Sequence, residues 1–245
     1  KPNVDTGMGL DRVMAVLHGH RSVYDTELFK SLFETLAFNQ EIMSNAEVSK
    51  ARVILDHIRA SVFIAGDGVE PSNKERGYIL RRLLRRAFVF ARMLNLQGHW
   101  LEGLIGKIVT NYATAYPELV EKSNHIFQVL EQEQAKFAAT LDKGLKEFEK
   151  LTTKQGTLDG NDAFNLYQTF GFPWELTHEL ATQMLGKDLD KKEFESGFKK
   201  HQELSRTATA GEFKGGLANT SEPVVKLHTA THLMQKALRQ VLGDH

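Results

Sequence analysis

Apolar residues recur along most of the chain at spacings of three and four, which is the period of an amphipathic helix. No stretch shows the sustained alternation of apolar and polar residues that is typical of a half-buried strand. The pattern therefore predicts a mainly α fold. Its expected helices cover Leu10–Leu17, Asp25–Phe38, Ser49–Ala65, Asn73–Leu94, Trp100–Tyr116, Glu118–Leu151, Ala163–Thr169, Leu176–Leu185, Lys191–Ser205 and Leu227–Leu242.

The longest periodic segment, Glu118–Leu151, carries a heptad-like apolar stripe. Its members are separated by 4, 7, 4 and 7 positions and are Ile126, Leu130, Phe137, Leu141 and Phe148. This pattern is more typical of core packing or a helical hairpin than of a cofactor site. Gly144 interrupts the segment, at a cost of up to about 1 kcal/mol relative to alanine.

The segment Pro71–Arg92 is expected to form a capped helix with arginine on one side. Ser72 and Glu75 have the spacing of a capping box. At 100° per residue, an arc of about 140° holds Arg81, Arg82, Arg85, Arg86 and Arg92. The opposite side carries Leu80, Leu83, Leu84, Ala87 and Phe90. A rigid arginine row suits a nucleic-acid backbone, and a solvated, salt-bridged helix face is an equally good interpretation.

Composition limits the classes of function. The 245 residues have a formal net charge of zero, so a nucleic-acid site would require local clustering of basic residues. The absence of cysteine excludes disulfides and thiolate metal ligands within this sequence. No apolar run approaches the length of a membrane span, and no signal peptide is visible. Both ends look cut, so we expect an interior piece of a longer protein.

Three short motifs offer candidate chemistry, each with an ordinary alternative. Gly7 and Gly9 allow close backbone approach, and Arg12 can neutralise a phosphate; the alternative is a glycine turn before a surface arginine. His228 and His232 lie four residues apart, a spacing that presents two imidazoles on one helix face for zinc. Two ordinary histidines are at least as good an interpretation of that pair.

The third motif places amides on a short helix. Asn165 and Gln168 precede Gly171 and Pro173, which should end the helix. Asparagine and glutamine can read base edges because each amide offers both a donor and an acceptor. A polar helix end without a ligand explains the same residues.

Seven motifs in order together resemble the alanyl-tRNA synthetase family of class II. They span almost the whole chain and are Val4–Arg12, Tyr24–Phe29, Arg52–Arg59, Gly66–Asn73, Arg76–Arg82, Leu166–Pro173 and His228–Met234. The resemblance implies an intact enzyme that uses ATP with Mg²⁺ to join alanine to tRNA(Ala) through an alanyl-adenylate. It also implies a cytoplasmic protein without a membrane partner, and leaves the oligomeric state open.

The resemblance also implies roles for individual residues. Gly7, Gly9 and Arg12 match class II motif 3, where the glycines line the ATP site and the arginine contacts the phosphates. Asn73 matches the asparagine that approaches a G·U wobble pair of the acceptor stem. Phosphate contacts are then expected from Arg81, Arg82, Arg85 and Arg86.

Two departures from the family pattern bear on these roles. Gln168 stands where many members have aspartate; its amide can accept a hydrogen bond from a guanine amino group and can also donate one. His228 and His232 match half of the zinc site of the editing domain, whose other ligands are absent from this sequence. We therefore expect weak zinc binding by this chain.

The resemblance divides the chain into four segments. Residues 1–22 would end the catalytic domain, 23–207 would recognise the acceptor stem, 208–223 would be a glycine-rich linker, and 224–245 would begin the editing domain. We expect no alanine activation by this chain alone. The alternatives are a non-catalytic helical RNA-binding module with an arginine-rich face, and a helical scaffold whose arginines form salt bridges within the protein.

Overall fold

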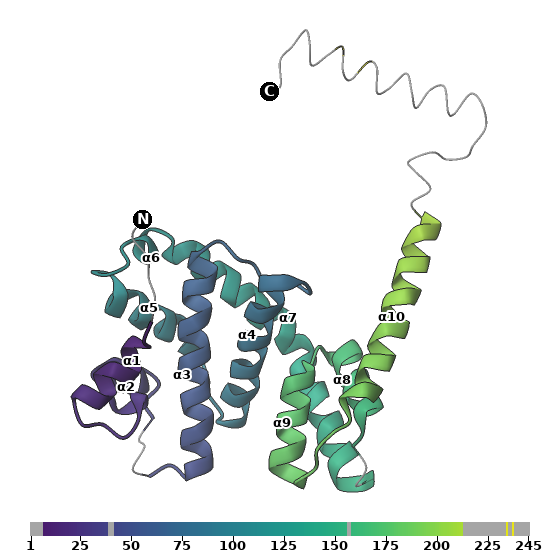
Figure 1. Ribbon diagram of the computed structural model, residues 1–245, viewed down its shortest axis with the longest axis horizontal. Helices are drawn as coiled ribbons and strands as arrows, with labels where there is room; N and C mark the ends of the chain where they lie inside the picture. Colours follow the sequence, from purple (N-terminus) through teal and green to yellow (C-terminus); the bar gives the residue numbers. More distant parts are fainter. Residues whose placement is uncertain (1–6, 39–41, 156–157, 213–233, 235–236, 238–245) are drawn as a thin grey trace. The chain divides into compact units, whose positions relative to one another are not determined.

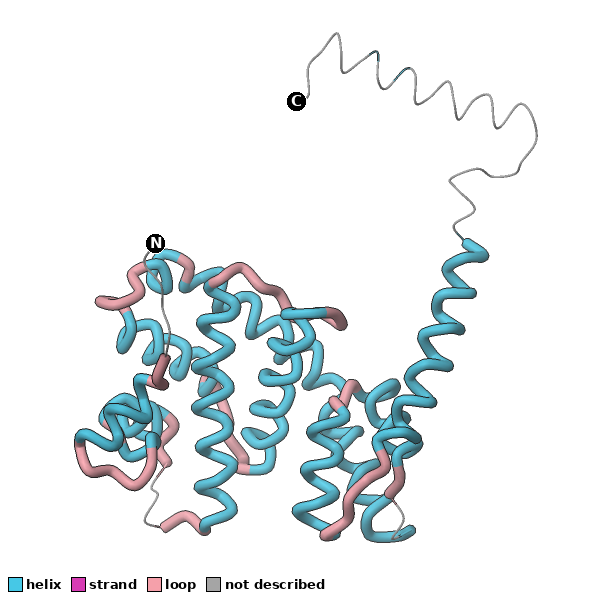
Figure 2. The backbone as a smooth tube through the Cα atoms, in the orientation of Figure 1, coloured by secondary structure: helices cyan, strands magenta, loops and turns pink. Residues whose placement is uncertain are grey.

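The computed structural model describes residues 7–38, 42–155, 158–212, 234 and 237. Every regular element within these ranges is helical, which confirms the mainly α prediction (Figure 2). The elements are α1 (Leu10–Leu17), η1 (Val23–Asp25), α2 (Glu27–Thr35), α3 (Asn45–Gly66), α4 (Glu75–Met93), α5 (Trp100–Tyr112), α6 (Glu118–Glu121), α7 (Ser123–Lys150), η2 (Leu151–Gln155), α8 (Gly160–Phe170), α9 (Trp174–Leu185) and α10 (Lys191–Glu212).

The chain divides into two compact units, residues 1–190 and 191–245. The first unit holds α1 to α9, and α10 belongs to the second. The predicted division into four functional segments stays a prediction. No helix among the described residues is long and apolar enough to cross a membrane.

The centre of the first unit is the pair α3 and α4, which lie side by side (Figure 1). Both helices carry fully buried apolar side chains at helical spacing, which are Ile54, Ile58 and Val62 on α3 and Leu80 and Leu84 on α4. Burial of each such side chain contributes about 1.5–3 kcal/mol relative to exposure. The predicted apolar side of the arginine helix therefore faces the core.

The long helix α7 packs against this pair through its predicted stripe. All five stripe residues are buried: Ile126, Leu130, Phe137, Leu141 and Phe148. The interpretation as core packing is therefore confirmed. Gly144, which the sequence identified only as an interruption, lies where Phe172 packs directly onto α7, and a Cβ at Gly144 would overlap that ring.

Several predicted boundaries require correction. The segment Asp25–Phe38 forms the end of a 3₁₀ turn followed by α2, and Glu118–Leu151 is divided into α6 and α7 at Lys122. The linker expected over residues 208–223 is helical at residues 208–212, because α10 continues to Glu212. The last predicted helix, Leu227–Leu242, lies largely outside the described residues.

The capping box predicted at Ser72 and Glu75 is also wrong. The N-cap of α4 is Lys74, and its side chain makes no capping hydrogen bond. Ser72 Oγ instead donates to the carbonyl of Lys74 at 3.0 Å. Glu75 has a φ of 48°, so the backbone bends sharply at the start of the helix and Ser72 lies outside it.

Candidate nucleic-acid interface

The loop that precedes α4 holds Asn73 at an exposed position. The backbone amide of Ser72 donates to the carbonyl of Gly77 at 3.0 Å, and Lys74 N donates to Ser72 Oγ at 3.3 Å. A Cβ at Gly77 would overlap Ser72 and lie 2.5 Å from the carbonyl of Glu70, so glycine is required for this close turn. The loop is thus fixed by its own backbone and by Ser72.

Arg81 holds the side chain of Asn73 from the first turns of α4. One guanidinium nitrogen donates to Asn73 Oδ1, and another donates to the carbonyl of Pro71 at 3.1 Å. The carboxamide oxygen of Asn73 is therefore engaged within the protein. Its NH₂ group lies at the other end of the carboxamide and is the end that can donate to a ligand.

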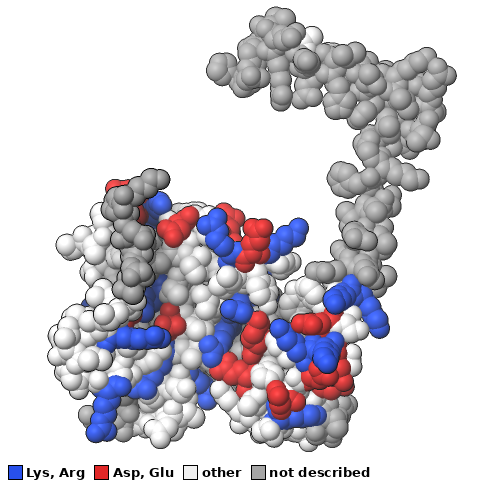
Figure 3. Space-filling model, viewed as in Figure 1, with Lys and Arg blue, Asp and Glu red and all other residues white. Residues whose placement is uncertain are grey.

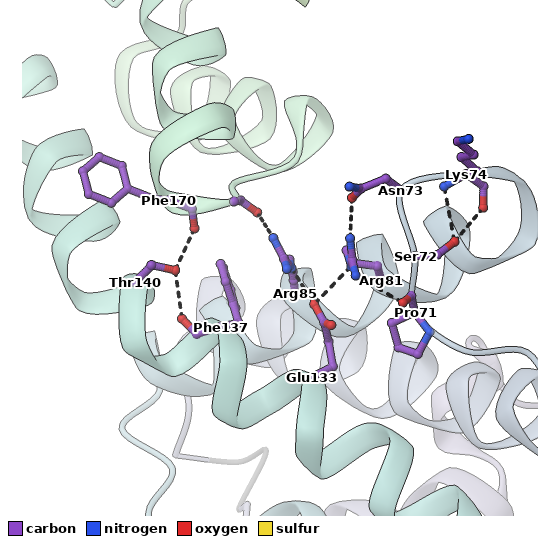
Figure 4. A network of polar contacts seen from close by, with 11 residues as sticks. Pro71, Ser72, Asn73, Lys74, Arg81, Arg85, Glu133, Phe137, Thr140 and Phe170 are labelled. Atoms are coloured by element: carbon purple, nitrogen blue, oxygen red, sulfur yellow. Dashed lines mark hydrogen bonds and ion pairs between the residues drawn. The ribbon is translucent and has the colours of Figure 1, made fainter. Parts of the chain in front are cut away.

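Glu133 of α7 lies beneath Arg81 and Arg85 (Figure 4). Its side chain is 3% exposed, and its Oε1 atom lies 2.7 Å from Arg85 Nε and 3.4 Å from Arg81 Nε. A buried carboxylate is costly unless it is paired and hydrogen-bonded. Here Arg85 Nε hydrogen-bonds to one oxygen of Glu133, and Arg81 Nε forms an ion pair with the same oxygen without a hydrogen bond. Figure 4 shows that the contacts run from Asn73 through Arg81 and Glu133 to Arg85.

The same network reaches the end of α8. Arg85 donates to the carbonyl of Gly171 at 2.7 Å, and Thr140 Oγ1 donates to the carbonyl of Phe170 at 2.9 Å. Gly171 has a left-handed φ of 75° and ends the helix as the sequence predicts. Gln168 lies three residues earlier and is exposed.

Arg82 and Arg86 bind the first turns of α9. Arg82 Nη1 lies 2.9 Å from Glu175 Oε1, and Arg86 makes two hydrogen bonds of 2.6 Å with Glu179. The hydroxyl of Tyr78 donates to the other oxygen of Glu175 at 3.3 Å. Burial, together with the negative charge of Glu175, raises the pKa of Tyr78 to about 12.

The arginine row is thus salt-bridged within the protein, which is the alternative that the sequence left open. Each of the five arginines pairs with an acidic residue; the fifth, Arg92, lies 2.8 Å from Asp142. Arg82 and Arg92 are the most exposed of them, at 36% and 48%. On the face drawn in Figure 3, basic and acidic side chains of the described residues lie interleaved.

Gly7, Gly9 and Arg12 lie together at the start of α1. Gly9 is the N-cap, and its carbonyl accepts from Arg12 N at 3.1 Å. Both glycines and the arginine are exposed. The neighbouring Asp11 binds Arg59 of α3 at 2.8 Å, a contact that the residue pattern did not predict.

Glu133 is another residue that the sequence reasoning missed, although a signal was present. The apolar stripe of α7 has two gaps of seven residues, from Leu130 to Phe137 and from Leu141 to Phe148. Each gap contains a position at helical spacing that faces the core, and these positions hold Glu133 and the interrupting glycine. A charged residue at a core position indicates a buried ion pair.

The predicted zinc pair, His228 and His232, lies outside the described residues. Within the ranges that the structure describes, no three His, Asp or Glu side chains are grouped to hold a metal ion. The zinc assignment therefore stays a prediction from sequence.

Comparisons with known proteins agree with the motif pattern. The family described as tRNA synthetases class II (A) matches residues 1–240. Alanine–tRNA ligases of Borreliella afzelii and Treponema pallidum are each 46% identical over 99% of this chain, which spans 42% of their length. That of Sphingopyxis alaskensis is 40% identical over 86% of the chain and 24% of its own length. The chain belongs to the class II tRNA synthetases, within the alanyl-tRNA synthetase family.

Proposed function

We propose that the intact protein is an alanine–tRNA ligase and that residues 23–207 recognise the acceptor stem of tRNA(Ala). The observation that carries this proposal is the exposed carboxamide of Asn73, held by Arg81 at the tip of a fixed loop. A short side chain held in one orientation can discriminate between base pairs, whereas a mobile one loses that geometry. Similarity to alanine–tRNA ligases supports the substrate class.

The two exposed amides would have complementary roles at a G·U pair. Asn73 has its oxygen engaged by Arg81, so its NH₂ group would donate to an acceptor on a base edge. Gln168 can accept from the guanine amino group through its own carboxamide oxygen. A donor and an acceptor on one pair would distinguish G·U from G·C better than either group alone.

Phosphate contacts would come from arginines that already form ion pairs with carboxylates of the protein. Arg82 is more exposed than Arg81, Arg85 and Arg86, so it is the member of the predicted set with the best access to a backbone phosphate. The less exposed members, Arg81, Arg85 and Arg86, would act by holding the helices in place. The affinity for RNA would then depend less steeply on salt concentration than binding by four free arginines would.

The start of the chain would contribute to the ATP site of the intact enzyme. Gly7 and Gly9 carry no side chains to obstruct a nucleotide, and exposed Arg12 suits a phosphate group. ATP with Mg²⁺ would supply the phosphates, and Arg12 would stabilise charge that develops on them during adenylate formation. Zinc would require ligands beyond His228 and His232, because two imidazoles do not complete a site.

The test is binding of this chain to an acceptor-stem hairpin of tRNA(Ala), with G·U or with G·C, at two salt concentrations. We expect preference for G·U, which Asn73→Ala removes and which the exposed Asn124→Ala leaves unchanged. Loss of one specific contact costs about 1–3 kcal/mol. Equal, salt-sensitive binding would indicate a general RNA-binding module, and absence of binding would indicate a scaffold.

A further inference from the structure

One buried carboxylate connects the two parts of the surface to which the proposed function assigns base-pair recognition. Glu133 pairs with Arg81, which holds Asn73, and with Arg85, which holds the carbonyl of Gly171 at the end of α8. We propose that Glu133 is a positioning residue for acceptor-stem recognition, which fixes the Asn73 loop and the end of α8 in one geometry. The proposal rests on the proposed function.

The burial of Glu133 supports a geometric role. The side chain occupies a core-facing position of α7 between Leu130 and Phe137, where an apolar residue would continue the stripe. Replacing a buried ion pair with apolar residues is often neutral or stabilising, so stability alone does not explain a glutamate here. What the carboxylate adds is a fixed point at which two guanidinium groups meet.

Arg81 and Arg85 each make a further contact that fixes the orientation of the guanidinium group. Arg81 also donates to the carbonyl of Pro71 at 3.1 Å, so it holds the loop at two points. The guanidinium of Arg85 also lies over the ring of Phe137, 4.9 Å from its centroid. Arg85 is therefore held on one side by a carboxylate and on another by an aromatic face, and it can donate to α8 in a single orientation.

Helix α7 itself provides a second link to α8. Thr140 lies two turns beyond Glu133 and donates to the carbonyl of Phe170 at 2.9 Å. The end of α8 is thus fixed to α7 both directly and through Arg85. The Asn73 loop, in contrast, has its side-chain link to α7 through Arg81 and Glu133, so a change at Glu133 should affect the loop more than α8.

The test compares Glu133→Gln with a matched control, Glu131→Gln, on the same helix. Both variants lose one negative charge, but Glu131 is exposed. Affinities of the 245-residue chain for the G·U and G·C acceptor-stem hairpins are measured by fluorescence anisotropy. We expect Glu133→Gln to reduce the G·U preference by about tenfold, the factor for one lost contact of about 1.4 kcal/mol, with the G·C affinity unchanged. Glu131→Gln should retain the preference.

A double variant tests whether Glu133 acts through Asn73. In an Asn73→Ala background the effect of Glu133→Gln on G·U preference should shrink, because the group that it positions is already absent. Fully additive effects of the two substitutions would overturn the proposal.

Circular dichroism and thermal melting establish that each variant folds. If Glu133→Gln does not fold, Arg81→Lys decides, because lysine keeps the charge and cannot bridge Asn73 and Pro71 in the same way. Loss of G·U preference in Arg81→Lys supports the proposal, and an unchanged preference overturns it. A wild-type chain that prefers neither hairpin would overturn the proposed function as well, whereas wild-type preference that survives Glu133→Gln refutes this inference alone.

Discussion

The guanidinium of Arg86 and the carboxylate of Glu179 face each other in a two-point ion pair. Arg86 Nε and Nη2 each donate to one carboxylate oxygen at 2.6 Å, and the two side chains are 27% and 22% exposed. The pair joins α4 to α9 between residues 93 positions apart. The pair is bidentate and partly shielded from solvent, so it should contribute more to the free energy of unfolding than an ordinary surface ion pair does.

We therefore expect Glu179→Gln to lower the free energy of unfolding by about 1–3 kcal/mol, since it leaves Arg86 without a charged partner. The matched change Glu175→Gln affects the more exposed pair with Arg82 and should cost less than about 1 kcal/mol. Urea unfolding of both variants measures the difference. Equal losses of unfolding free energy in the two variants would show that the Arg86–Glu179 pair stabilises the protein no more than the exposed Arg82–Glu175 pair does.

Two helical glycines should respond to alanine with opposite signs. Gly144→Ala would force a Cβ into the ring of Phe172, and overpacking of this kind costs about 1–3 kcal/mol. At Gly106 of α5 nothing lies within 4 Å of the added Cβ, so alanine should stabilise the chain by about 0.5–1 kcal/mol through helix propensity. Thermal melting of both variants distinguishes the two effects, and stabilisation by Gly144→Ala would contradict the packing shown here.

Gly171 should be less replaceable than Gly186, although both end helices in the left-handed region. Their φ values are 75° and 62°, so alanine brings a backbone cost of about 1–2 kcal/mol at either position. At Gly171 the Cβ would also collide with Arg85 Nη1, which donates to the carbonyl of the same glycine, whereas the space at Gly186 is empty. Gly171→Ala should therefore be the more destabilising in urea unfolding; the reverse order would rule out the Arg85 contact.

The hydroxyl of Tyr78 should lose its proton at a higher pH than an ordinary tyrosine does. Burial and the nearby Glu175 raise its pKa from the ordinary 10.0 to about 12, so the folded state favours the protonated form. The associated stability is fully present below pH 10 and is lost as the pH rises toward 12. Tyr78→Phe should flatten that part of the stability profile.

Phenolate absorbance provides the measurement for Tyr78. The wild-type titration minus that of Tyr78→Phe should show one phenol with a midpoint near pH 12. A midpoint near pH 10 in this difference would mean that Tyr78 is solvated and not held against Glu175. Urea unfolding between pH 9 and 11 tests the stability effect separately.

Most helices could be predicted from the sequence because a helix with one buried side has apolar residues at every third or fourth position. The stripe of α7 and the apolar side of α4 could be counted from residue spacing, and both face the core as expected. The start of α4 could not be located in this way, because Ser72 had two possible partners. The Ser72 hydroxyl could have formed a capping box with Glu75 or a hydrogen bond with Lys74. Because Glu75 has a positive φ, the backbone bends there and the hydroxyl bonds to Lys74.

The partners of the arginines were beyond reach of local reasoning. Glu133 lies 48 positions from Arg85, and Glu179 lies 93 positions from Arg86. Helical periodicity identifies which residues share a side and does not identify what lies opposite. Only the positions of α7 and α9 beside α4 reveal that the arginine row meets carboxylates of the same chain.

The loop before α4 has a consequence for the thermodynamics of recognition. Ser72 bonds to Lys74 and Gly77, and Asn73 is bound by Arg81, so the loop has its conformation in the absence of RNA. The conformational entropy of this segment is lost during folding, and association with a ligand need not lose it again. Recognition at Asn73 would then proceed by docking onto a preorganised surface, with fast association and little change in heat capacity from local ordering.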